Sequence, residues 1–309
     1  MSAATSDNIK PRANIADYFF FLRPMLHPPV WTIVILGFFR ISDNYSFKLG
    51  LLMLTSSAAA SWAFILNQLS DIESDRLNRK LFFLPQNIIT PAAAKILAAG
   101  MLISTISGGF ALGPEIGLLF VFGLLLGFAY SVKPFDWRAR PLAGFLSNAV
   151  AHGTLPFAAG YIVAGGEPLA GLMRSIPYFL AVGGVFIATT IPDYEGDRKS
   201  GKVTPAVRLG MNMASALMTL CTILAIISAW LFHDTALAIS GLTSLPFYFL
   251  NWVKTSARNS ALAAKISILF LSLAAGWYFR PYLLIMLILI LLTRIYYKWR
   301  FKMTYPTLA

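Results

Sequence analysis

Apolar residues in this chain come in long runs, and these runs restrict the fold more than any other feature. Ten runs are candidate membrane-spanning helices, at residues 18–40, 47–70, 92–112, 115–132, 141–164, 174–192, 212–232, 235–253, 261–279 and 281–297. A bilayer core is crossed by about 20 apolar residues in a helix. The chain is 57% hydrophobic and 12% charged, whereas soluble domains are about one quarter charged. We predict an all-α polytopic transmembrane bundle of nine to ten spans, with two pseudo-repeated halves around a central cavity.

The apolar runs also predict how the chain is divided. We expect a disordered cytoplasmic lead over residues 1–16, one transmembrane domain over 17–300 and a C-terminal tail over 301–309. Pro24, Pro28 and Pro29 fall in the first span and are expected to bend or break it, because proline removes a helical hydrogen bond. Pro192 stands near the end of the sixth span and predicts a helix end or kink there.

The net charge of +12 at first suggests a nucleic-acid partner, but its distribution favours a membrane. With both ends of a ten-span chain in the cytoplasm, 21 of the 25 Lys and Arg residues lie on the cytoplasmic side. Cytoplasmic loops of membrane proteins carry such an excess of basic residues. We therefore predict an integral protein of the cell membrane that contacts the lipid bilayer and binds no nucleic acid.

The pattern Asp-x-Glu-x-Asp-Arg occurs twice, at the ends of the second and sixth predicted spans. The first acidic box is residues 71–76 and the second is residues 193–198, and together they hold six of the 13 acidic residues. Membrane proteins built from repeats place their sites where the repeats meet. We therefore expect the two boxes to converge on one cavity whose chemistry faces the cytoplasm.

The spacing of the acids within each box predicts metal binding. In a helix, Asp71 and Asp75 share a face, as do Asp193 and Asp197, and Asn67 lies one turn before Asp71. Like charges at this spacing destabilise a helix, and their desolvation near a membrane costs more. Mg²⁺ removes both costs, because carboxylates are suitable ligands and Mg²⁺ shares its shell with substrate phosphates.

Two facing carboxylate pairs predict a site for a diphosphate. Two Mg²⁺ ions held by such pairs would stabilise the charge that builds on a departing diphosphate. Arg76, Arg198 and Lys199 would add positive charge, whereas Glu73 and Glu195 fall off the shared face. His27 and His152 stand in apolar stretches, and we interpret both as packed side chains.

These motifs resemble the UbiA-type intramembrane prenyltransferase superfamily over residues 18 to 211. The first family signature, Asn-Asp-x-x-Asp-x-x-x-Asp, stands here as residues 67–75 with Gln68 in place of the first Asp. The second stands as residues 193–197, followed by a Val-x-Leu-Gly ending at Gly210. Residues 22–24 match the family's first helix, and residues 130–148 resemble its Tyr-Ser-x-x-Pro…Asn stretch. Phe82-Phe83 replaces a common Arg-Pro, so we expect the diphosphate site to differ there and at Gln68.

The resemblance implies a Mg²⁺-dependent enzyme that moves a prenyl group from a polyprenyl diphosphate donor to a lipophilic acceptor. The implied metal ligands are Asn67, Asp71, Asp75, Asp193 and Asp197. The implied contacts of the donor diphosphate are Asn67 and Asn148 with Arg23, Arg76, Arg138, Arg198 and Lys199. Tyr130 is implied to stabilise the prenyl cation or to orient the acceptor.

Several alternatives stay open. The acceptor class is open between aromatic, carotenoid and lipid molecules, although residues 130–148 look somewhat like the carotenoid-elongating branch. A cation-coupled transporter could use paired acids, but here the acids stand at span ends and not at the midplane where transporter sites lie. An acceptor-free cyclase or hydrolase of prenyl diphosphates is a third interpretation. The oligomeric state is not predicted.

Overall fold

The computed structural model describes residues 13–73 and 83–306, and every regular element within them is a helix. Seven helices in this part of the chain are long and apolar enough to cross a membrane. They are α3 (Phe47–Ser70), α5 (Pro91–Leu112), α6 (Pro114–Ser131), α13 (Met211–Leu231), α14 (Thr235–Val253), α15 (Ala257–Tyr278) and α16 (Arg280–Phe301). Two bent pairs of shorter helices raise the number of candidate spans to nine if each pair crosses once. The predicted all-helical, multi-span membrane fold is therefore confirmed.

Proline starts several of these helices and accounts for the first bend. Helix α1 (Ile15–Phe21) and the 3₁₀ turn η1 (Pro24–Leu26) meet α2 (Pro28–Phe38) at 53°. Pro24 and Pro28 stand at helix N-termini, where the missing N–H costs nothing because that donor has no helical partner. The predicted bend in the first span is therefore confirmed. The second bent pair is α9 (Pro168–Arg174) and α10 (Ile176–Thr190), which meet at 42°.

The fifth apolar run forms one helical stretch in three parts. Helix α7 (Pro141–Ala149) passes through a π-turn, η3 (Val150–Thr154), into α8 (Leu155–Val163). Gly153 in the turn lies against α10, because a Cβ at this position would come 2.7 Å from the carbonyl oxygen of Tyr178. The turn therefore packs directly on α10, and a larger residue at position 153 would push the two backbones apart.

The first and last helices of the described chain are joined by a buried ion pair. Asp17 of α1 is fully buried and accepts hydrogen bonds from Arg300 at 2.9 Å and from the Tyr296 hydroxyl, both of α16. Phe20 stacks on the Tyr296 ring with the ring centroids 3.9 Å apart. The ordered helix starts at Ile15, two residues before the domain boundary that we expected at residue 17.

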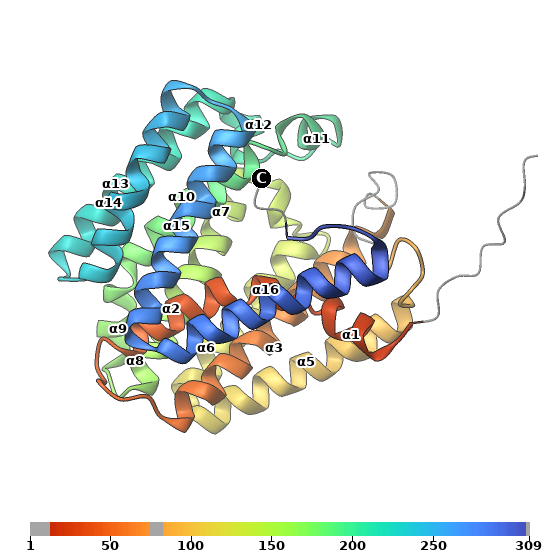
Figure 1. The fold of residues 1–309 in the computed structure, drawn as a ribbon, viewed down its shortest axis with the longest axis horizontal. Coiled ribbons are helices and arrows are strands. Elements are labelled where there is room, and N and C mark those ends of the chain that lie inside the picture. The colour runs from red at the N-terminus through yellow and green to blue at the C-terminus, as the bar shows by residue number, and fades with distance from the viewer. Residues whose placement is uncertain (1–12, 74–82, 307–309) are drawn as a thin grey trace, which may run out of the picture.

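The long helices form two groups with α2 between them (Figure 1). Helices α3, α5 and α6 pack together on one side, and α10, α13, α14 and α15 pack together on the other. Helix α16 passes in front of α2 and α3 in this view. The chain therefore divides into the two halves that the repeated acidic boxes predicted.

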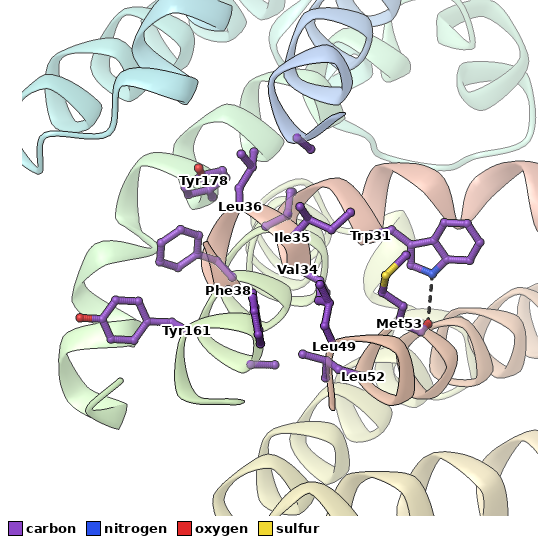
Figure 2. Close-up of a cluster of buried hydrophobic side chains, with 14 of the residues drawn as sticks. Trp31, Val34, Ile35, Leu36, Phe38, Leu49, Leu52, Met53, Tyr161 and Tyr178 are labelled. Atoms are coloured by element: carbon purple, nitrogen blue, oxygen red, sulfur yellow. Dashed lines mark hydrogen bonds between the residues drawn. The ribbon is translucent and has the colours of Figure 1, made fainter. Parts of the chain in front are cut away.

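Helix α2 packs directly on the backbone of α8, in the middle of the bundle (Figure 2). A Cβ at Gly37 would come 2.2 Å from the Phe157 carbonyl oxygen, and one at Gly160 would come 2.1 Å from that of Val34. Small residues allow such close contact between helices in a membrane. The Trp31 indole of α2 donates a hydrogen bond of 3.0 Å to the Met53 carbonyl of α3. The broken first span is thus held between the two halves.

Candidate active site

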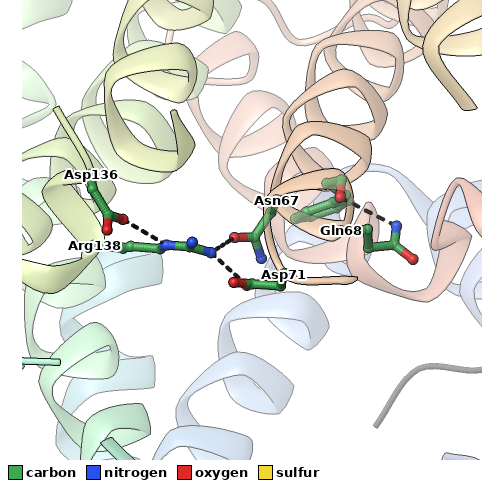
Figure 3. Close-up of polar contacts among 6 residues, drawn as sticks. Asn67, Gln68, Asp71, Asp136 and Arg138 are labelled. Atoms are coloured by element: carbon green, nitrogen blue, oxygen red, sulfur yellow. Dashed lines mark hydrogen bonds and ion pairs between the residues drawn. The ribbon is translucent and has the colours of Figure 1, made fainter. Parts of the chain in front are cut away.

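The first acidic box ends α3 and is bound by an arginine from a distant loop. Asp71 caps the C-terminus of α3, and Asn67 lies one turn earlier. Arg138, from the connection between α6 and α7, donates a hydrogen bond of 2.7 Å to the Asn67 amide oxygen. The same nitrogen forms an ion pair with the Asp71 carboxylate (Figure 3). Two predicted metal ligands and one predicted diphosphate contact therefore converge on one point.

Arg138 is held in place from its other side by Asp136. The Asp136 carboxylate accepts a hydrogen bond of 2.8 Å from the Arg138 Nε. Asp136 has a φ of 42°, in the left-handed region, which aspartate tolerates better than most residues. Burial opposes the charge on the Arg138 guanidinium, but the carboxylates of Asp71 and Asp136 more than compensate and raise the pKa of Arg138. Arg138 therefore stays charged and neutralises part of the first box.

Gln68 does not belong to this site, which corrects the expectation that it alters the diphosphate contacts. Its side chain is buried on a different face of α3 from that of Asn67 (Figure 3). Its amide donates to the carbonyl oxygens of Phe64 and Phe21, at 3.2 and 3.3 Å. Adjacent residues on a helix point about 100° apart, so Asn67 and Gln68 face different neighbours. Gln68 ties α3 to the end of α1.

The second acidic box has a different framework. Helix α10 ends at Thr190, and a separate short helix, α11 (Tyr194–Lys199), begins after Pro192. This confirms the predicted helix end at Pro192. The Asp197 N–H donates 2.8 Å to the Asp193 carbonyl, so one helical turn keeps the two acids on the same side. Asp193, Glu195, Arg198 and Lys199 are exposed, whereas Asp197 is half-buried.

One acid from each box, Asp71 and Asp197, lies near Tyr130 at the end of α6. The charges of Arg138, Asp197 and Asp71 all act on its hydroxyl group, and Asn148 of α7 lies within hydrogen-bonding reach of it. Asn148 also donates 2.9 Å to the Gly144 carbonyl, which fixes its amide on the inner side of α7. Residues from α3, α6, α7 and α11 therefore surround one position.

A cavity of about 260 Å³ opens from this position into the apolar part of the bundle. Arg23, Asn67, Tyr130 and Asn148 line its polar part, and most of the other lining side chains are apolar, among them Trp62, Phe120 and Leu155. Along α3 the lining runs from Asn67 to Ser56, a rise of about 16 Å in a helix. Gly123 and Gly127, whose orientation matters for cavity depth, both face inward here. The cavity thus has the polarity of an amphiphile with a charged head.

Arg23 reaches the cavity through a strained backbone conformation. It has a φ of 56° and a ψ of 55°, between α1 and η1. A residue with a side chain in this left-handed region costs roughly 1–2 kcal/mol. This conformation makes the turn from α1 into η1 and leaves the Arg23 side chain in the cavity lining.

The side-chain oxygens of Asn67 and Asp71 are suitable ligands for a hard divalent cation. The carboxylate and amide oxygens of Asp71 and Asn67 converge within the reach of one guanidinium nitrogen, and such oxygens are ligands that Mg²⁺ prefers. Within residues 13–73 and 83–306, no three His, Cys, Asp or Glu side chains are grouped closely enough to hold an ion. The predicted ligand Asp75 and the predicted contact Arg76 lie outside the described residues.

One feature of the site was not predicted from the sequence. Asp136 was given no role, although an aspartate two residues before a site arginine is a signal that could have been used. Phe83, which with Phe82 replaces the family's common Arg-Pro, is buried against Phe21 and Phe301, with ring centroids 5.8 Å apart in each pair. Phe82 lies outside the described residues.

Comparison with known proteins gives one consistent family. A family model described as the UbiA prenyltransferase family matches residues 28–266. The chain is 29% identical over 217 residues to a probable homogentisate phytyltransferase 2, chloroplastic, of Oryza sativa subsp. japonica, covering 62% of this chain and 55% of that protein. It is 31% identical over 188 residues to a digeranylgeranylglyceryl phosphate synthase of Pyrococcus abyssi, covering 60% and 65%. The chain spans about half the length of the plant relatives that it matches.

The fold also matches solved structures. A UbiA homolog from Archaeoglobus fulgidus bound to GPP and Mg²⁺ superposes with a TM-score of 0.66, over 84% of this chain and 98% of that one. The two sequences are 21% identical, so this likeness concerns the arrangement of the helices. A digeranylgeranylglyceryl phosphate synthase structure superposes with a TM-score of 0.64 at 20% identity.

Proposed function

Because the chain belongs to the UbiA prenyltransferase family, we propose that it transfers a prenyl group from a polyprenyl diphosphate to a lipophilic acceptor inside the membrane. The observation that carries this proposal is the cavity below Tyr130, which is polar at one end and apolar along its length. A prenyl diphosphate has the same division. Its charged head would lie beside Arg23 and Asn67, and its chain would run among the apolar side chains.

The acidic boxes are proposed to bind this head through Mg²⁺. Asn67, with Asp71 and Asp75 of the first box and Asp193 and Asp197 of the second, would hold the metal. The Archaeoglobus homolog was solved with both GPP and Mg²⁺, which supports the same pairing here. When bound, Mg²⁺ stabilises negative charge on the diphosphate as the bond to the prenyl carbon breaks.

The basic residues are proposed to share this task. Arg138 now neutralises Asp71, and a metal bound there would release the guanidinium to contact a phosphate oxygen. Arg23, Arg76, Arg198 and Lys199 would add positive charge around the head. Tyr130 and Asn148, at the boundary between the polar and apolar parts of the cavity, would orient the first carbon of the prenyl chain.

The apolar wall of the cavity supports transfer over hydrolysis. Trp62, Phe120 and Leu155 surround the space next to the proposed head site, and an apolar site excludes water from a reactive cation. An acceptor bound in the same space would then be the available nucleophile.

The test is a product assay on purified protein in lipid nanodiscs. Geranyl, farnesyl and geranylgeranyl diphosphates are supplied with Mg²⁺ and a panel of aromatic, carotenoid and lipid acceptors, and products are identified by mass spectrometry. We expect diphosphate release only with Mg²⁺ and an acceptor, and a product with the summed mass of acceptor and prenyl group. Release without any acceptor would indicate a hydrolase or cyclase, and ion flux without chemical change would indicate a transporter.

We further propose that the site faces the cytoplasm, in the cell membrane. In the predicted topology the two boxes lie on the side that carries 21 of the 25 Lys and Arg residues, and the positive-inside rule assigns that side to the cytoplasm. Ser200, exposed just after α11, is a suitable reporter. In a Ser200→Cys, Cys221→Ala double variant, a membrane-impermeant maleimide should label residue 200 in inside-out vesicles and leave it unlabelled in intact cells. The reverse pattern would refute this orientation.

A further inference from the structure

Two cavities lie side by side in the bundle and share one wall. The first has the proposed diphosphate site at its polar end. The second has a volume of about 420 Å³ and lies between α2, α10, α13, α14 and α15. Four residues line both cavities: Val30, Phe64, Asn148 and His152. Two lipophilic molecules, one in each cavity, would therefore meet at these four side chains.

The second cavity suits an uncharged and mainly apolar molecule. Its lining contains no Lys, Arg, Asp or Glu. Most of its hydroxyl groups already donate a hydrogen bond within the bundle. For example, Ser240 donates 2.7 Å to the Ala236 carbonyl, Thr222 donates 3.0 Å to the Met218 carbonyl, and Ser267 donates 2.9 Å to Tyr248. These hydroxyl groups therefore have little remaining capacity to donate a hydrogen bond to a ligand.

His152 is the exception on the shared wall. Its half-buried side chain lines both cavities, and the hydrogen bonds found within residues 13–73 and 83–306 include none to its ring. A neutral imidazole offers one donor and one acceptor, so a molecule bound in either cavity can supply a partner. His27 shows the contrast, because it is buried and hydrogen-bonded to the Ser61 hydroxyl at 3.1 Å. The interpretation of both histidines as packed residues therefore suits His27 better than His152.

The backbone at His152 is also unusual. The residue lies in the π-turn η3, and single π-turns inside helices occur frequently at functional sites. Gly153 allows the turn to pack directly on the backbone of α10, and this contact fixes the backbone position of the neighbouring residue, His152. Asn148, within reach of the Tyr130 hydroxyl, lies one turn earlier, or about 5 Å along the axis. His152 is thus beside the place where the proposed head site ends and the apolar space begins.

We propose that His152 hydrogen-bonds a hydroxyl group of the acceptor and thereby selects acceptors that carry one. The acceptor would place its apolar body in the second cavity and its hydroxyl-bearing end at the shared wall. The prenyl donor would occupy the first cavity. This inference rests on the proposed function, because it takes the second molecule to be the acceptor.

The test compares two probes that differ by one hydroxyl group, 1-naphthol and naphthalene. Their dissociation constants are measured on the full protein in nanodiscs by equilibrium dialysis, with empty nanodiscs as the blank. We expect wild type to bind 1-naphthol about fivefold more tightly, which corresponds to ~1 kcal/mol for one net hydrogen bond. His152→Leu should abolish this preference while leaving naphthalene binding unchanged, and His152→Asn should retain most of it.

Controls separate this role from a structural one. His27→Asn changes a histidine that lines neither cavity, so it should keep the preference. Equal binding of both probes by wild type, or a preference that survives in His152→Leu, would overturn the proposal. The probes need no prenyl transfer, so the result is independent of the product assay. An active transferase without the preference refutes only the role of His152, and the preference without transferase activity refutes only the proposed function.

Discussion

The two acidic boxes share one sequence pattern but differ in how the fold holds them. The first ends a 24-residue helix and is bound by Arg138, so that only 16% of the Asp71 side chain is exposed. The second lies on a six-residue helix after Pro192, with Asp193 exposed. Asp71 of the first box is therefore held in place by Arg138 before any ligand binds, whereas the second box is joined to the bundle through a helix break. Two copies of one sequence motif can therefore differ in how firmly the fold holds their side chains before a ligand binds.

Removing the carboxylate from either box should have the largest effect. If both boxes hold Mg²⁺, Asp71→Ala and Asp193→Ala should each lower kcat/KM for the prenyl diphosphate by roughly 100-fold or more, as loss of a charge-stabilising group does in other enzymes. Diphosphate release measures this. Glu195→Ala is the matched control, because Glu195 is an exposed acid of the second box outside the proposed ligand set. Full turnover in both Asp variants would refute the metal assignment.

Arg138 tests the first box, because it forms an ion pair with Asp71. Arg138→Ala should lower kcat/KM by about tenfold and should destabilise the metal-free protein by about 1–3 kcal/mol, since Asp71 loses its buried partner. Thermal unfolding in EDTA and in Mg²⁺ measures this, and Mg²⁺ should stabilise the variant more than wild type. Arg140→Ala, at an exposed arginine two residues away, is the control. Equal stabilisation of variant and wild type by Mg²⁺ would contradict the role of Arg138.

Pro192 tests whether the break before the second box matters. Pro192→Ala allows α10 to continue toward α11, which would turn Asp193 and Asp197 away from Tyr130. We expect kcat/KM to fall a few-fold, with KM for the prenyl diphosphate rising more than kcat falls. Pro168→Ala, at the start of the distant helix α9, controls for loss of a proline. Unchanged kinetics in Pro192→Ala would mean that the break does not position the second box.

Gln68 should give the smallest effect on activity. Gln68→Asp restores the residue of the family signature but buries a carboxylate against the carbonyl oxygens of Phe21 and Phe64. We expect KM for the prenyl diphosphate to stay within twofold of wild type, while stability falls by about 1–3 kcal/mol because two buried acceptors lose their donor. Steady-state kinetics and thermal unfolding measure the two effects. A markedly lower KM would place residue 68 in the site after all.

The sequence alone determined the elements of the fold and most of the candidate site. Membrane spans follow from the length of apolar runs, because the bilayer core leaves a chain few ways to satisfy its backbone. The repeated boxes gave the identity of Asn67, Asp71, Asp193 and Asp197, since their spacing along a helix is a local property. Pro192 and the prolines of the first span predicted the helix breaks, because the effect of proline on a helix is also local.

Only the tertiary structure decided which side chains meet. Arg138 lies 67 residues from Asp71, and the contact between them depends on how the loop after α6 folds over α3. Gln68 adjoins Asn67 in the sequence but faces α1, because the packing of α3 sets which side of the helix faces the cavity. The position of the His152 ring at the junction of the two cavities is likewise a product of packing. Spacing along the chain fixes neighbours within a helix, whereas contacts between helices depend on their relative rotation.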